Sequence, residues 1–239
     1  MVTLGPARKT GGHPKRDDDL SDYVHRQLIG YIGFGLPFVL YLLAAVRHDP
    51  GDGRWHLLDS ISAYYYTGAV AAFVGLLVAL ALFLFSYQGY GNKHHRYDRA
   101  LAITAGFAAL GVAFFPMTAP DPNAPAWIAQ TASLHYVSAV ILFGSFAAFC
   151  LWLFRLQKPH ERMTSGKQRR NHIYLWCGVV IIGGMVWAFL NERRGQEIIG
   201  PESLCVGAFC LSWLTKGKAV RSIRSRARAM FRKPPAARP

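Results

Sequence analysis

Two ionisable side chains lie inside apolar stretches of this sequence, and both can transfer protons. His135 lies in a stretch that carries no formal charge from residue 122 to residue 154, and Glu202 stands near the start of the last apolar stretch. Because an ionisable group inside a membrane is costly, it marks a candidate functional site when it faces other helices. A histidine near a carboxylate can act as a general base, and Ser62 can supply a nucleophilic hydroxyl.

Each of these residues also has a structural interpretation. A hydrogen bond between helices would explain His135 equally well, and Glu202 costs little if it lies at the boundary with water. No catalytic residue is therefore assigned from the sequence, and His135, Glu202 and Ser62 stay candidates.

Six apolar segments would have to position these side chains. A bilayer core of about 30 Å requires roughly 20 apolar residues in a helix, and charged residues make up only 17% of this chain, against about 25% in typical soluble domains. The sequence predicts an all-α, polytopic membrane protein, a six-transmembrane helix bundle over residues 28–214. Its spans are expected at about 28–46, 63–86, 100–116, 129–154, 173–191 and 198–214. The sixth is the weakest, because it contains Pro201 and Glu202.

The polar residues of these spans gather near one end of the predicted bundle, while the other halves are almost wholly apolar. This pattern predicts a ligand-binding pocket in the outer half, although tyrosines at this depth are also typical of an interfacial aromatic belt. The expected pocket residues are Ser60, Ser62, Tyr65, Thr67, Thr118, Thr131, His135, Glu192 and Glu202.

The distribution of basic residues predicts the orientation. If six spans alternate in direction, 23 of the 27 Lys and Arg fall on one side. The positive-inside rule then places both termini in the cytoplasm, in a bacterial cytoplasmic membrane. Residues 1–27 are expected to form a polar, disordered cytoplasmic arm without the apolar core of a secretory leader.

Residues 215–239 are predicted to form a basic amphipathic tail on the cytoplasmic side. Such a segment next to a final span favours anionic inner-leaflet lipids. Nucleic acid has the same electrostatics, but we expect lipid because the tail is tethered to the membrane. The expected lipid contacts are Lys216, Lys218, Arg221, Arg224 and Arg228.

Cofactor and metal motifs are not indicated. A bis-histidine haem needs two histidines inside spans, and only His135 lies in one. The four cysteines have no C-x-x-C spacing, so neither a disulfide framework nor a zinc site is expected.

The stretch DSISAYYYTGAVAAFVGLLVALALFLFSYQGY, followed by LGVAFFPMTAP and a histidine in the fourth span, resembles a group of bacterial multi-span integral membrane proteins with an SISxYYYT-type second helix. The resemblance covers roughly residues 28–214 and rests most specifically on residues 60–67, 89–90 and 115–116. It implies no assigned activity. In that group a charged pair often follows the YYYT sequence, whereas residues 68–71 are apolar here, which argues against ionisable groups on this part of the helix.

Three classes of function remain open. The first is binding or transport of a small or lipid-like molecule through the outer pocket; transport would require a homodimer, because the inner halves offer no polar pathway. The second is a membrane-embedded lipid hydrolase using His135, Ser62 and Glu202. The third is a structural or accessory subunit without chemistry of its own.

Overall fold

The computed structural model describes residues 15–46, 57–89, 94–118, 131–156 and 163–218. These ranges contain helices and no strand. The helices are α1 (Lys15–Val46), α2 (Val70–Ser86), α3 (His95–Phe114), α5 (Ala132–Leu151), α6 (Ser165–Glu192) and α7 (Ile199–Lys216), with two short 3₁₀ helices, η1 (Ser62–Tyr66) and η2 (Leu153–Arg155).

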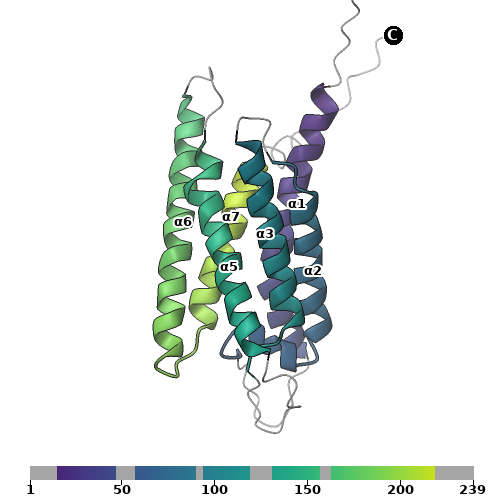
Figure 1. The fold of residues 1–239 in the computed structure, drawn as a ribbon, viewed down its shortest axis with the longest axis vertical. Coiled ribbons are helices and arrows are strands. Elements are labelled where there is room, and N and C mark those ends of the chain that lie inside the picture. The colour runs from purple at the N-terminus through teal and green to yellow at the C-terminus, as the bar shows by residue number, and fades with distance from the viewer. Residues whose placement is uncertain (1–14, 47–56, 90–93, 119–130, 157–162, 219–239) are drawn as a thin grey trace, which may run out of the picture.

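The six α-helices run side by side along the long axis of the molecule (Figure 1). Each packs against the next in the chain, and α7 packs back against α1, so the bundle closes into a ring. Helices α5 and α7 also contact each other directly, so α6 lies at the periphery of the bundle. The predicted all-α bundle of six helices is therefore confirmed.

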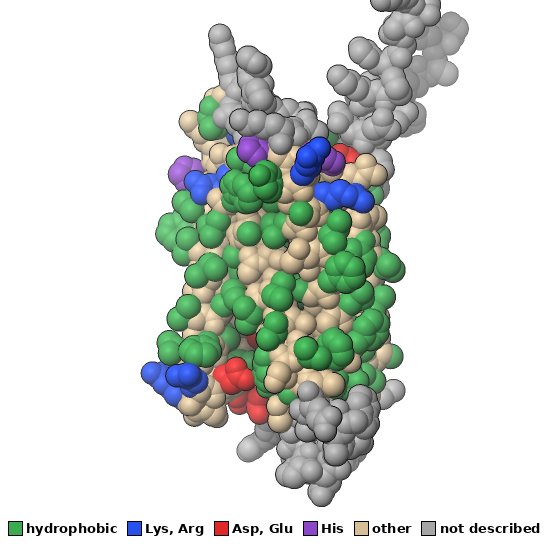
Figure 2. All heavy atoms as spheres, in the orientation of Figure 1, with side chains coloured by type: hydrophobic (Ala, Val, Ile, Leu, Met, Phe, Trp, Pro, Cys, Tyr) green, Lys and Arg blue, Asp and Glu red, His purple; other side chains and the backbone are tan. Residues whose placement is uncertain are grey.

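Four helices are long and apolar enough to cross a membrane, over Asp22–Leu43, His95–Phe114, Ala132–Arg155 and Ser165–Glu192. Helix α2 is also apolar but has only 17 residues. Charged side chains gather at the two ends of the face shown in Figure 2, with hydrophobic side chains between them. This distribution fits a protein that lies in a lipid bilayer.

The two ends of the bundle differ in the elements that they carry. We call the end with η1, the N-terminus of α5 and the turn between α6 and α7 the far end. The opposite end, with the N-terminus of α1 and the C-terminus of α7, is the basic end. In the far half α5 and α6 flank a cavity, whereas in the basic half Gly178 of α6 lies directly against Leu151 of α5.

The N-terminal arm was predicted too long, because α1 begins at Lys15 rather than near residue 28. The last part of this arm packs on the end of α7: Gln27 Nε2 donates to the Gly217 carbonyl at 2.7 Å. Arg26 is buried and pairs with Asp22, one helical turn earlier, at 3.1 Å. These polar contacts allow the helix to extend beyond its apolar segment. Residues 1–14 lie outside the described residues.

The second span also differs from its prediction, since the regular helix begins at Val70 and not near residue 63. Thr67 separates η1 from α2. Its hydroxyl donates to the Tyr64 carbonyl at 2.7 Å and accepts from the Ala69 amide at 3.1 Å. These local bonds satisfy backbone groups that a continuous helix would otherwise pair, which is how Ser and Thr hydroxyls commonly interrupt helices.

Candidate functional site

The candidate site lies at the far end, and His135 is the side chain on which it is built. His135 is 3% exposed and uses both ring nitrogens. Its Nδ1 lies 2.6 Å from the Phe115 carbonyl oxygen, and its Nε2 lies 3.0 Å from Ser62 Oγ. A carbonyl oxygen can only accept, so Nδ1 carries the hydrogen. In the neutral ring Nε2 is then the acceptor, and the Ser62 hydroxyl donates to it.

The carbonyl that orients His135 is available because α3 ends just before it. Phe115 is followed by Pro116, and a residue before proline is pushed out of the helical region; Phe115 has φ −104° and ψ 104°. Helix α3 therefore ends at Phe114, and the Phe115 carbonyl is left to accept a side-chain donor. The Phe-Pro pair of the sequence thus has a direct local role in holding the imidazole.

The chain segment that carries Ser62 is fixed by hydrogen bonds to the end of α3. Tyr66 Oη donates to the Met117 carbonyl at 2.5 Å, and Ser60 Oγ lies 3.3 Å from Met117 Sδ. Ser60 Oγ also accepts from the Ala63 amide at 3.0 Å. The η1 helix is therefore held on both sides of Ser62.

Glu202 connects η1 to α7. Its Oε2 accepts from the Ile61 amide at 2.6 Å, directly before Ser62. In return, the Asp59 carbonyl accepts from the Ile198 and Ile199 amides, both at 2.8 Å, at the start of α7. Because the first amides of a helix have no partner within it, this carbonyl caps α7. Segment 59–62 and the start of α7 thus position each other.

A cavity of about 590 Å³ opens beside this network, between α5, α6 and α7. Its polar residues are Ser60, Ser62, His135, Tyr136, Glu192 and Glu202. The remaining wall is mainly apolar and includes Val140 of α5, which is 60% exposed, and Phe189 of α6, which is 54% exposed. Since residues on the outer surface of the bundle line it, the cavity opens sideways, toward the region that lipid would occupy.

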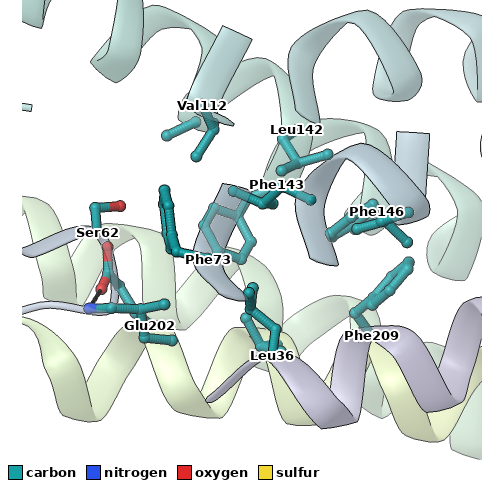
Figure 3. A pocket seen from close by; sticks show the side chains of 15 residues that line it. Leu36, Ser62, Phe73, Val112, Leu142, Phe143, Phe146, Glu202 and Phe209 are labelled. Atoms are coloured by element: carbon teal, nitrogen blue, oxygen red, sulfur yellow. Dashed lines mark hydrogen bonds between the residues drawn. The ribbon is translucent and has the colours of Figure 1, made fainter. Parts of the chain in front are cut away.

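A second, much smaller chamber of about 50 Å³ lies inside the ring (Figure 3). Ser62 and Glu202 stand at one end of this chamber, and Phe146 and Phe209 stand at the other. The two aromatic rings stack with centroids 3.6 Å apart. Ser62, Ala139, Phe143 and Glu202 line both spaces, so they form the wall between the lateral cavity and the inner chamber.

The cavity brings together five of the nine residues expected in the pocket. These are Ser60, Ser62, His135, Glu192 and Glu202. The other four, Tyr65, Thr67, Thr118 and Thr131, do not line it. Tyr65 packs its ring edge-on against Phe73, the Thr67 hydroxyl is used in the turn before α2, Thr118 is exposed, and Thr131 precedes the first residue of α5.

The two described lysines of the expected lipid-binding tail contact the protein itself. Lys216 Nζ lies 3.4 Å from the Phe154 carbonyl and 4.9 Å from the centroid of the Phe154 ring. Lys218 Nζ donates to Tyr23 Oη at 2.5 Å. Arg221, Arg224 and Arg228 lie outside the described residues, so lipid binding by the tail stays a prediction.

Sequence reasoning missed the apolar side of the cavity, which α6 supplies through Gly184, Met185 and Ala188. Gly184 and Ala188 are one helical turn apart on the same face of α6, and this spacing is the sequence feature that could have indicated this wall. Small residues in membrane helices generally indicate close helix packing. Here Gly184 does pack closely on Cys205 of α7, while Ala188 leaves space beside α5.

Among the described residues, no group of three or more His, Cys, Asp or Glu side chains could hold a metal ion. No family model matches the chain, and no curated protein or solved structure matches it either. The resemblance to bacterial proteins with an SISxYYYT-type helix therefore stays a prediction.

Proposed function

We propose that this chain is a bacterial cytoplasmic-membrane protein that binds one lipid-like amphiphile in its lateral cavity. The observation that carries the proposal is the shape of that cavity: about 590 Å³, open toward the side of the bundle and polar only at the far end. This volume lies in the range of about 300–1,000 Å³ that is usual for small-molecule sites. A molecule with one apolar part and one polar group would match the apolar wall and the polar end of the cavity.

The charges of the cavity restrict the polar group of the ligand. Its lining includes the carboxyl groups of Glu192 and Glu202, and the described residues that line it include no Lys or Arg. Hydrogen-bond donors and cations are therefore favoured over phosphates, which usually require Arg, Lys or several amide donors. We infer that the head group of the amphiphile carries a hydroxyl or an amine.

Binding fits this cavity better than transport. Transport needs a route for the polar group to the other end, whereas the inner chamber beside Ser62 is small and ends at Phe146 and Phe209. The ligand would therefore enter and leave through the side opening. A homodimer is not needed for this function and stays a separate prediction.

Binding can be tested with two matched substitutions on α6. Ala188 lines the cavity, whereas Val186 is 54% exposed and does not line it. Ala188→Phe should reduce the lipid that co-purifies with the detergent-solubilised protein at least tenfold, as measured by native mass spectrometry. Val186→Phe should leave it unchanged.

The head group can be tested by the same measurement. Glu202→Gln should lower the occupancy of lipids with hydroxyl or amine head groups, because an amide NH₂, which only donates, replaces a carboxyl oxygen that can accept a hydrogen bond. The proposal is wrong if Ala188→Phe and Glu202→Gln both retain the same lipid at wild-type occupancy. An accessory role would then be the better explanation.

A further inference from the structure

The hydrogen bonds at the far end order three groups in a row. Ser62 Oγ lies 3.0 Å from His135 Nε2, and His135 Nδ1 lies 2.6 Å from the Phe115 carbonyl oxygen. An activated serine nucleophile has the same arrangement. Its hydroxyl donates to an imidazole, and a third group orients that imidazole. A backbone carbonyl here takes the orienting position that a carboxylate often holds.

We propose that Ser62 is the nucleophile of an acyl-transfer site, that His135 is its general base, and that the substrates are acyl esters of small alcohols. This inference rests on the proposed function, because the ester would be the amphiphile held in the lateral cavity. Ser62 and His135 both line that cavity. Ser62 is only 9% exposed, so it is largely shielded from open water.

The position of Ser62 suits an ester that enters from the lipid. The acyl chain would lie along Val140 and Phe189 at the side opening, and the alcohol would lie toward Glu192. The ester group, between chain and alcohol, would then reach Ser62 at the border between the apolar and polar walls. Phosphate-bearing esters are disfavoured by the two carboxyl groups, so the alcohol carries hydroxyl or amine groups.

Ser60 is positioned to assist as a hydrogen-bond donor. Its hydroxyl points to Met117 Sδ at 3.3 Å, and a thioether is a weak acceptor. Ser60 lines the same cavity as Ser62. The oxyanion of a tetrahedral intermediate is a far stronger acceptor, and hydrogen bonds that strengthen as charge develops accelerate such reactions.

The proposed step balances with water as the only co-reactant. Ser62 Oγ bonds to the ester carbonyl carbon while its proton moves to His135 Nε2. The bond from carbonyl carbon to alcohol oxygen then breaks, and the alcohol leaves with the proton from Nε2. Water attacks the acyl-serine and gives a proton to Nε2. The Ser62 oxygen recovers this proton as the fatty acid leaves.

The test uses the purified full chain and an alkyl fluorophosphonate, which phosphonylates activated serines and releases fluoride. Mass spectrometry of the protein and its peptides should locate the adduct on Ser62. Ser62→Ala should abolish this adduct. His135→Gln should slow its formation at least 100-fold, since a general base contributes about 10²–10⁴-fold. Ser60→Ala should slow it about tenfold or more.

The matched control is Ser145→Ala. Ser145 is also a buried serine on the bundle, but its hydroxyl donates to the Ile141 carbonyl in its own helix at 2.7 Å and does not line the cavity. Its removal should leave the rate of labelling unchanged. Thermal unfolding of each variant identifies those that fail to fold, and only folded variants are compared.

Lipid binding and serine labelling can fail independently of each other. A folded wild-type protein that co-purifies lipid but forms no adduct at Ser62 overturns the nucleophile and leaves binding intact. An adduct that forms equally fast in folded His135→Gln overturns the role of His135 as a base. If Ala188→Phe and Glu202→Gln keep all their lipid, the binding proposal fails whatever the labelling shows.

Discussion

At the scale of single residues, the far end depends on hydrogen bonds that join segments distant in the sequence. Ser62 and His135 are 73 residues apart, and Ile61 and Glu202 are 141 apart. In an apolar environment a polar group without a partner is costly. Each bond therefore stabilises the site mainly by avoiding an unpaired partner in the membrane, and the same bonds hold Ser62 at the cavity wall.

The bond from Tyr66 to Met117 gives a residue-scale prediction. Tyr66→Phe removes the donor to the Met117 carbonyl and should lower the free energy of unfolding by about 1 kcal/mol, the usual net value of such a bond. Tyr65→Phe is the matched control, because the contacts of Tyr65 with Tyr66 and Phe73 are made by its ring. Chemical denaturation in detergent measures both. Equal losses in the two variants would contradict the prediction.

The sequence identifies the candidate side chains of this site but not their hydrogen-bond partners. His135, Ser62 and Glu202 were identified because polar groups are rare in apolar segments. Nothing in the sequence indicates that the Phe115 carbonyl accepts from His135. Every residue has a backbone carbonyl, so residue type does not single one out. Their polarity predicts Tyr65 and Thr67 in the pocket, but the Tyr65 ring packs against Phe73 and the Thr67 hydroxyl bonds within its own turn.

At the scale of helices, α6 is the element that shapes the cavity. It touches α7 closely at Gly184, where an added Cβ would overlap Cys205 Sγ and lie 3.3 Å from the Pro201 carbonyl. Small residues allow such close contact between membrane helices. Gly184 and Cys205 both line the lateral cavity, so this close contact forms part of its wall.

Substitution of Gly184 tests this contact. Gly184→Val should destabilise the protein by about 1–3 kcal/mol, as expected for overpacking. Gly183→Val adds the same side chain at the preceding position, where nothing lies within 4 Å of an added Cβ. It should destabilise the protein much less. Thermal unfolding of the two purified variants provides the measurement. If Gly183→Val is equally destabilising, helix propensity and not packing is responsible.

The number of helices was predictable, but their ends were less so. Hydropathy identifies the apolar part of each helix, and α1, α3 and α6 all begin several residues before that part, at Lys15, His95 and Ser165. A search for apolar segments does not detect the first turn of a helix when that turn is polar. For α6, the Thr164 hydroxyl accepts from the Lys167 amide at 3.2 Å and caps the helix in a polar region.

At the scale of the whole molecule, the proposed orientation can be tested by cysteine labelling. The four native cysteines are all buried, so they should contribute little background. Gln196 lies between α6 and α7, Gln168 lies at the start of α6, and both are exposed. An impermeant maleimide should label Gln196→Cys in intact cells and Gln168→Cys only after permeabilisation. The reverse pattern would invert the proposed topology.

The alternating direction of the helices was predictable from short connections and basic residues, whereas the closed ring was not. Closure requires α1 to meet α7, and it depends on close approaches such as those of Gly30 to Leu214 and Gly33 to Phe209. An added Cβ at Gly33 would lie 2.9 Å from the Phe209 ring. No local sequence pattern predicts which distant helix a glycine will contact.

The contact between α1 and α7 also has a consequence for biosynthesis. Because α1 is synthesised before α7, the face of α1 that contacts Leu214 and Phe209 must face lipid or an insertion factor until α7 has been made. The five earlier helices can pair in order as they emerge, but Glu202 meets the Ile61 amide only when α7 arrives. The site therefore becomes complete only after α7 has joined the bundle.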